Sequence, residues 1–402
     1  MMTLSDKQKT TTAIIVIIGL LIGQMSVDLY LPSLPAMRHY FQTSAATVQM
    51  SLSLYLIGYG LGHPVCGSFS DHLGRKPILL IGTAVILIGA LLCSLTTSLW
   101  VLLVARFIQG CGGSAFSLIW KATLRDIYEG PDFLKMMSYS SMTWVTIPVL
   151  APLLGSYIQT YLGWRFNFAL LALLSALFLL VVLFYLPETL SAENHSPLNL
   201  KNSALSYKQV LSTPQFMVNT FCWAILCISI IGFLVAAPFL FQVALHFSPV
   251  QYGWTLVFIA AGCVISSYLN TRIVNYQRIL KIGFTLGLWS FFLCGLFMLI
   301  TGWLGIFNLW VVAVPMFILF FFTGIVFPQC ISRAMAPFTQ LIGVAGAVWG
   351  TILFFTAAIG TSIVAYLPEN NQLHFSIVCV ICAILAILLY YGVIQKSNVS
   401  NK

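Results

Sequence analysis

The chain has 402 residues, of which 60% are hydrophobic and 7% are charged, and its formal net charge is +9 at pH 7. Soluble domains carry roughly 25% charged residues, so this composition excludes a water-soluble globule. The basic residues are scattered through short segments between apolar runs and form no single patch, which argues against a nucleic-acid partner.

Twelve apolar runs follow one another along the chain, and each is long enough to cross about 30 Å of hydrocarbon as a helix. Backbone groups in lipid must be satisfied within their own segment, so we expect helices. The first run is too long for the core of a cleavable signal peptide and is interpreted as a permanent span. The predicted spans are 13–32, 48–69, 77–96, 99–122, 137–160, 166–186, 215–240, 251–271, 281–302, 308–330, 342–366 and 373–394.

One polar stretch, 187–214, separates the first six spans from the last six, whereas the other connections are short. We therefore predict an all-α membrane protein of about twelve transmembrane helices. A six-helix bundle covers 1–190, a linker covers 191–214 and a second six-helix bundle covers 215–402. Two such halves rocking about a central site are typical of secondary transporters.

The distribution of basic residues predicts the orientation of the chain. With the N-terminus inside, all of the 18 Lys and Arg residues except Arg38, Arg106 and Arg165 fall on the inner side. The positive-inside rule then places both termini in the cytoplasm. We expect a multi-pass protein of the inner (cytoplasmic) membrane.

Asp28 is the one acidic residue inside a predicted span. A carboxylate there costs several kcal/mol unless it is paired, hydrated or protonated, so a functional role is the default hypothesis. Arg106, in the fourth span, lies at nearly the same depth, because Asp28 is about 22 Å along its helix from the inside and Arg106 about 10 Å from the outside. We predict that the two pair and that Asp28 loads and releases a proton. The alternatives are a structural carboxylate and an arginine that snorkels outward.

Three further polar residues accompany this pair. Gln24 lies one turn before Asp28, and Gln109 lies one turn from Arg106, so each either lines the same cavity or bonds a neighbouring helix. His63, in the second span, is either a second titrating site or a neutral, hydrogen-bonded histidine.

The loop after the second span combines glycines with charges. Gly67 and Gly74 permit a tight turn, Asp71 can bond Arg75, and Arg75 and Lys76 anchor the inner face. Such a charged latch suits a gate that opens in one state and closes in another, although a charged turn between spans is also commonplace.

The fifth span contains two prolines four residues apart, Pro148 and Pro152, which remove backbone hydrogen bonds and allow bending. Gly155 permits close helix packing. A hinge role and a packing role are equally open for these three residues.

Aromatic residues of the second half, Trp223, Phe233 and Trp310, are candidates to line a substrate cavity together with Tyr30 and Gly113 of the first half. Each is also an ordinary residue of a membrane protein core or lipid-facing surface. The ten cysteines show no metal-ligand clustering, and no metal site is predicted.

Several of these runs resemble signatures of one transporter family. Gly67, Asp71, Gly74, Arg75 and Lys76 resemble the G-x-x-x-D-x-x-G-R-K loop of the major facilitator superfamily, and 106–110 is similar to its R-x-x-Q-G signature. The run DLYLPSLP at 28–35 resembles the D-x-Y-L-P-x-L-P run of the Bcr/CflA drug-resistance transporters, and 125–128, 136–138 and 186–190 add to that likeness. Asp126, within the 125–128 run, is grouped with the latch.

The resemblance implies proton-driven export of drugs or other small molecules by alternating access, with a proton gradient and no cofactor. Asp28 and Arg106 match the positions that serve proton coupling in similar exporters. Two departures are His63, where a neutral polar residue is expected, and the fifth span, where 151–155 resembles only a shortened antiporter signature. We expect a monomer whose partners are a small-molecule substrate, protons and the lipid bilayer.

Three other functions remain as alternatives. The first is export of one endogenous metabolite, such as a siderophore, an amino acid or a sugar derivative. The second is proton-driven uptake. A membrane enzyme is the weakest, because the sequence offers no metal-ligand cluster, nucleophile–base pair or phosphate-binding loop.

Overall fold

A computed structural model describes residues 5–190, 200–273, 276–338 and 341–400. Helices dominate this part of the chain, which contains no β-strand. The elements are α1 (Asp6–Asp28), η1 (Leu31–Ser33), α2 (Leu34–Phe41), α3 (Ala45–Leu73), α4 (Arg75–Leu95), α5 (Leu99–Ile127), α6 (Gly130–Tyr161), α7 (Arg165–Tyr185), α8 (Leu200–Leu211), α9 (Pro214–Pro238), η3 (Phe239–Ala244), α10 (Pro249–Ile273), α11 (Gln277–Trp303), α12 (Leu309–Met335), α13 (Ile342–Ala365) and α14 (Leu373–Ser400).

Ten segments among the described residues are long and apolar enough to cross a membrane. The helices α3 and α6, with 29 and 32 residues, correspond to the predicted second and fifth spans but are not among the ten. Both are long enough to cross the hydrocarbon at 1.5 Å per residue.

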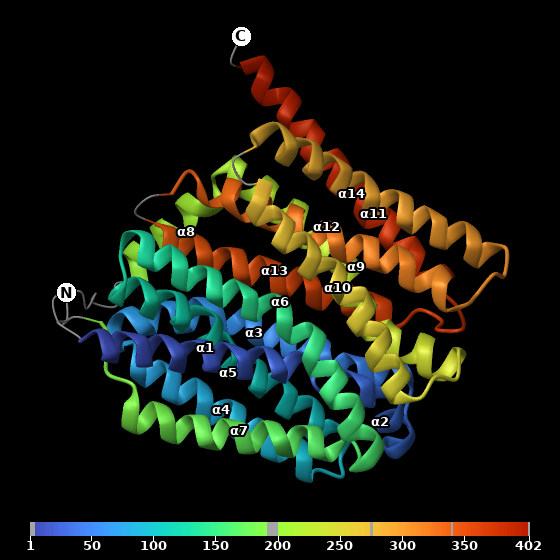
Figure 1. Cartoon of the computed structure of the whole chain (residues 1–402), viewed down its shortest axis with the longest axis horizontal. Helices are drawn as coiled ribbons and strands as arrows, with labels where there is room; N and C mark the ends of the chain where they lie inside the picture. Colours follow the sequence, from blue (N-terminus) through green and yellow to red (C-terminus); the bar gives the residue numbers. More distant parts are fainter. Residues whose placement is uncertain (1–4, 191–199, 274–275, 339–340, 401–402) are drawn as a thin grey trace.

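The long helices form two groups (Figure 1), the first from α1 to α7 and the second from α9 to α14. Within the first group α5 contacts α1, α3 and α4, and within the second α9 contacts α12, α13 and α14. Two seams join the groups, because α3 packs along α13 and α6 packs along α10. The central position of these seam helices places their polar residues between the two halves.

The predicted linker is partly helical. Its residues 200–211 form α8, which packs against α13, while 191–199 lie outside the described residues. The end of the molecule at which α1 begins and α3 meets α4 is called the latch end below, and the opposite end, where α1 stops, is called the far end.

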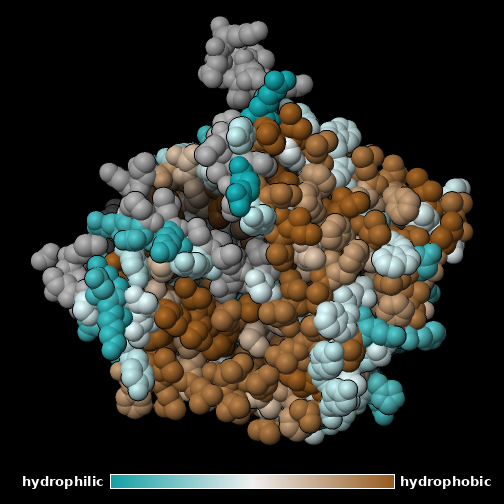
Figure 2. Space-filling view, viewed as in Figure 1, coloured by the Kyte–Doolittle hydropathy of each residue, from teal (hydrophilic) through white to brown (hydrophobic). Residues whose placement is uncertain are grey.

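Hydrophobic side chains cover the middle of the face shown in Figure 2, and hydrophilic residues gather toward its two ends. Large apolar side chains such as Leu173, Leu180 and Ile359 are more than half exposed. Soluble monomers rarely expose continuous apolar patches of more than a few hundred Å². The apolar band is therefore the surface expected to meet lipid.

Candidate functional site

Arg106 is fully buried on α5, where aromatic rings enclose its guanidinium group. Its central carbon lies 4.3 Å from the ring centre of Tyr30 and 4.4 Å from that of Tyr55. Nη1 donates hydrogen bonds to the Ser26 carbonyl oxygen at 2.9 Å and to Gln109 Oε1 at 2.7 Å. Attraction between a cation and ring faces is strong where water is excluded. The structure thus holds Arg106 inside the first half instead of letting it snorkel.

Asp28 ends α1 and is 1% exposed. Its Oδ2 accepts a hydrogen bond from Gln24 Nε2 at 3.0 Å, one turn earlier on the same helix. The predicted ion pair with Arg106 is absent from the described residues. Arg106 instead binds α1 at Ser26, which is two residues and roughly 200° around the helix from Asp28.

Tyr55 joins Arg106 at α1, where both side chains contact Ser26. Its hydroxyl is 2.6 Å from Ser26 Oγ, and its ring lies under Arg106. Both side chains are therefore attached to α1 two residues before Asp28, without a direct contact to its carboxyl.

Tyr252 of α10 is a residue that the sequence did not single out. Its side chain is fully buried, and its hydroxyl has no hydrogen-bond partner among the described residues. Helix α10 belongs to the second half and packs against η1, which closely follows Asp28 in the chain. A tyrosine in an apolar run carries no signal of such a position, because its role depends on which helix of the other half it meets.

His63 lies at the α3–α13 seam, where a Cβ added to Gly350 would be 2.5 Å from the ring. Nδ1 is 2.8 Å from the Tyr59 carbonyl oxygen, so it carries a proton, because a carbonyl only accepts. Nε2 is 3.1 Å from Ser117 Oγ, which is also 2.9 Å from the Ser114 carbonyl. The hydroxyl can donate to a neutral ring, or accept from a charged ring while donating to the carbonyl. Both predicted roles of His63 fit this geometry.

The latch is an assembled group of charges within the first half. Arg75 Nη1 is 2.6 Å from Asp71 Oδ1, and Arg75 Nε is 3.1 Å from Asp126 Oδ2. Ser70 Oγ accepts a further bond from Nη1 at 2.8 Å. Arg75 is buried, so these three acceptors compensate a charge that has lost most of its water.

Glu188 completes the latch, although the resemblance assigned it no role. Its carboxylate accepts from the backbone N–H groups of Arg75 at 2.9 Å and Lys76 at 3.1 Å, which open α4. An acceptor here satisfies N–H groups that have no partner inside the helix. Gly74 has φ 104°, and a Cβ on it would be 2.3 Å from Glu188 Oε2, so both the turn and the contact require glycine. Lys76 Nζ bonds the Leu183 carbonyl at 2.9 Å.

The two acids that bind Arg75 provide a matched pair for mutation. The Asp126 side chain is 21% exposed and that of Asp71 is 57% exposed. We expect Asp126→Asn to destabilise the protein by about 1–3 kcal/mol, because it weakens a charged acceptor in a partly buried site. Asp71→Asn should cost less than about 1 kcal/mol, because water screens that pair. Thermal unfolding midpoints in detergent measure both, and equal shifts would contradict this ranking.

Two residues of the predicted cavity lining lie elsewhere. Trp310, at the start of α12, is 62% exposed on the outer surface, where it packs edge-on against Phe258. Phe233 of α9 is fully buried among Phe241, Phe320 and Phe375. Apolar helices show no preferred face in their sequence, so composition alone cannot separate lipid-facing, core and cavity positions.

The other predicted lining residues contribute to packing around Arg106 or in the second half. Tyr30 bonds Ser51 Oγ at 3.0 Å, and a Cβ on Gly113 would be 2.4 Å from the Tyr55 hydroxyl. Gly113 therefore makes room for Tyr55. Trp223 is buried, with its ring centre 5.2 Å from that of Phe327.

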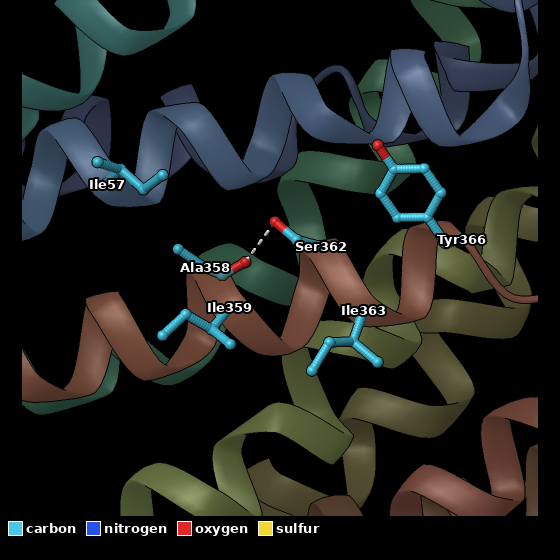
Figure 3. A pocket seen from close by; sticks show the side chains of 6 residues that line it. All are labelled: Ile57, Ala358, Ile359, Ser362, Ile363 and Tyr366. Carbon is cyan, nitrogen blue, oxygen red and sulfur yellow. Dashed lines mark hydrogen bonds between the residues drawn. The ribbon is translucent and has the colours of Figure 1, made fainter.

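A groove on the outer surface is distinct from the predicted cavity (Figure 3). Its volume is about 320 Å³, and α3 and α13 form its walls. The hydroxyl of Ser362 donates to the Ala358 carbonyl at 2.8 Å, which leaves the lining almost wholly apolar. Ile359, Ile363 and Tyr366 are each more than half exposed, so the groove faces the lipid-contacting surface. The lining residues are Ile57, Ala358, Ile359, Ser362, Ile363 and Tyr366.

The predicted bending residues lie on α6, which continues as one helix through Pro148 and Pro152. Gly155 meets the end of α1, where an added Cβ would be 1.7 Å from the Leu29 carbonyl oxygen. Close approach of two backbones is the common use of small residues in membrane helices. Gly155 thereby seats α6 directly beside the residue that follows Asp28.

Polar contacts link the two halves toward the far end, at the seams and beside them. Together with the buried state of Asp28, they show that the halves meet closely at this end. The contacts are Gln49–Glu369, Ser53–Thr361 at 2.9 Å, Gln242 to the Pro32 carbonyl at 2.9 Å and Trp254–Tyr157 at 3.4 Å.

No group of three or more His, Cys, Asp or Glu side chains that could hold a metal ion occurs within the described ranges. The polar groups of the site are therefore one carboxyl, one guanidinium, one imidazole and several hydroxyls. The carboxyl and the imidazole of this set can each bind and release a proton.

Comparison with known proteins agrees with this architecture. The family model described as Major Facilitator Superfamily matches residues 16–361. The chain is 27% identical to the bicyclomycin resistance protein homolog of Haemophilus influenzae, over 98% of each chain, and 26% identical to multidrug resistance protein D of Escherichia coli, over 96% of each. Its fold is similar to that of the xylose transporter XylE of E. coli in a partially occluded inward-open conformation, with a TM-score of 0.76 and 12% identity over 96% of this chain and 98% of the other.

Proposed function

This chain belongs to the major facilitator superfamily of transporters, and on that premise we propose that it exports drugs or other small molecules across the inner membrane in exchange for protons. Relatives named for bicyclomycin and multidrug resistance support a role in drug export. The single observation that carries the proposal is the buried Asp28 carboxyl at the end of α1, which accepts a hydrogen bond from Gln24 of its own helix.

The proposed topology has twelve spans, formed by the ten apolar segments together with α3 and α6. Residues 1–190 and 215–402 are the two halves, and the linker between them includes α8. The latch end carries Arg75, Lys76 and the start of α1, so the positive-inside rule assigns it and both termini to the cytoplasm. The far end then faces outward.

The proposed cycle follows from the cost of burying a charge. In the outward-open state Asp28 is hydrated, takes a proton and the substrate leaves. A neutral carboxyl can be enclosed between the halves with much less desolvation than a carboxylate, so protonation favours closure of the far end. The inward-open state releases the proton to the cytoplasm and binds the next substrate. The closed far end and the 1% exposure of Asp28 fit the stage after protonation.

Inside-out vesicles with an acidic lumen and a pH-sensitive dye test this proposal. Candidate drugs and metabolites are added to wild type and to Asp28→Asn, which keeps the side-chain shape but cannot release a proton. We expect compound-triggered proton efflux in wild type and a fall to background in the variant. Proton movement into the lumen with the substrate would indicate uptake. Equal efflux in both proteins would remove Asp28 from coupling and direct attention to His63.

A further inference from the structure

Glu369, in the connection between α13 and α14, reaches across the far end to the first half. Its carboxylate accepts a hydrogen bond from Gln49 Nε2 of α3. The Gln49 side chain is fully buried, and its other polar atom, Oε1, has no hydrogen-bond partner among the described residues. A buried acceptor without a donor is uncommon and calls for an explanation.

The two protonation states of Glu369 satisfy Gln49 differently. A carboxylate only accepts, so it can bond Nε2 but has no hydrogen for Oε1. A protonated carboxyl keeps the acceptor for Nε2 and adds an O–H group that can donate to Oε1. Acid and amide then form two parallel hydrogen bonds, and the orphan acceptor is satisfied.

We propose that Glu369 and Gln49 form a second proton-binding site, which holds the far end closed when Glu369 is protonated. The assignment of this clasp to the outer gate of an exporter rests on the proposed function. The clasp itself needs only the contact between the two halves. It is separate from Asp28, because Glu369 belongs to a connection between spans and Asp28 to the end of α1.

The surroundings of Glu369 support titration near neutral pH. Burial raises the pKa of this carboxyl from 4.5 to about 7, against the opposing effects of the Gln49 hydrogen bond and the charge of Arg38 on α2. Other titratable groups on adjoining elements are Tyr366, whose hydroxyl is 3.8 Å from a sulfur of α3, and His374 at the start of α14.

The sign of the pH effect follows from linkage. When the clasp opens, the exposed carboxyl returns toward its ordinary pKa of 4.5, so the closed state binds the proton more tightly. The stabilisation of the closed state is complete below that value and is lost as pH rises through about 7. An acidic outer compartment would thus favour closure of the far end, in the same direction as protonation of Asp28.

Distance measurements by double electron–electron resonance test the clasp. Leu162 and Leu304 are exposed at the far end of the first and the second half, respectively, and each is replaced by a non-natural amino acid that carries a spin label. Labelling through thiols is avoided because the chain has ten free cysteines. In wild type the ratio of closed to open populations should fall by up to about tenfold per pH unit between pH 5 and 7 and level off above.

Three variants distinguish the clasp from other titrating groups. Glu369→Gln supplies one donor and one acceptor like the protonated acid, so we expect a closed far end at every pH. Glu369→Ala should be more open at acidic pH and should keep only the titration that Asp28 contributes, so in an Asp28→Asn background it should be insensitive to pH. Gln49→Leu removes the paired bonds but keeps the buried carboxyl, so it should be more open at acidic pH while still titrating. Glu129→Gln, at the latch end, is the control and should titrate like wild type. A flat wild-type profile, or a Glu369→Gln profile that titrates like wild type, would overturn the proposal.

The same measurement in an Asp28→Asn background separates this proposal from the proposed function. If the clasp is independent, the distances still titrate through Glu369 although compound-driven proton efflux is lost. If the far-end distances no longer change with pH in Asp28→Asn, although Glu369 is intact, Glu369 is not an independent second proton-binding site. A further outcome is that the wild type exchanges protons for no compound while its far-end distances still change with pH. That outcome would contradict the proposed export and leave the clasp standing.

Discussion

Arg106→Lys is expected to lower compound-driven proton exchange by about 100-fold or more. Lysine keeps the charge but lacks the planar guanidinium that stacks on Tyr30 and Tyr55 while Nη1 donates its two bonds, and its shorter side chain displaces the charge from that position. A buried charge left without its partners costs roughly 3–5 kcal/mol, which corresponds to more than a hundredfold in an equilibrium. The vesicle dye assay measures this loss directly.

Arg165 offers a matched control for that substitution. Its guanidinium carbon lies 4.3 Å from the Tyr40 ring centre and 4.4 Å from that of Trp164, at distances almost identical to those in the Arg106 cage. Arg165 lies at the far end of the first half and is only partly buried. Arg165→Lys should therefore leave exchange within a few-fold of wild type. Equal losses in the two variants, or full activity of Arg106→Lys, would show that the buried cage is not required.

The layout of helices could be predicted from the sequence because hydrocarbon thickness sets a length that each apolar run must meet. Helix periodicity also places Gln24 and Asp28 on one face, although the bond between them was not among the roles predicted for Gln24. The pairing of Asp28 with Arg106 could not be settled in this way. Depth depends on position along one helix, but contact depends on how two helices are rotated about their axes.

Contacts between the halves were the least predictable part of the site. Glu369 reaches Gln49 because α13 packs along α3, and Tyr252 lies on α10, which packs along α6. Neither residue belongs to a local motif that would announce this contact. The positions of Trp310 and Phe233 were also not predictable from the sequence. A uniformly apolar helix does not show which of its faces meets lipid, the protein core or a ligand.

The two ends of the molecule differ in how their charges are used. Arg75 at the latch end is bound by acids of its own half, so these bonds can survive rocking of one half against the other. The far end is held by bonds between the halves, which must break when it opens. The latch therefore stabilises the first half as a unit, whereas the Glu369–Gln49 clasp belongs to the moving interface.

Gly155→Ala is expected to impair both stability and transport through the position of Asp28. The new Cβ would meet the Leu29 carbonyl oxygen at 1.7 Å, so α6 must move away from the end of α1. That movement strains the bonds from Asn167 Nδ2 to Ser33 Oγ, at 2.9 Å, and to the Gly155 carbonyl, at 3.4 Å. Overpacking of this kind costs about 1–3 kcal/mol. We expect a lower unfolding midpoint in detergent and a loss of proton exchange.

Gly346→Ala is the control for the general effect of placing alanine in a helix. Gly346 lies inside α13 with no atom within 4 Å of an added Cβ, so the change should stabilise the helix by roughly 0.5–1 kcal/mol. The contrast between the variants isolates the contact of α6 with α1 from helix propensity. An unchanged midpoint and normal exchange in Gly155→Ala would show that the backbones can separate at little cost. In that case the end of α1 does not depend on α6 to hold the Asp28 carboxyl between the two halves.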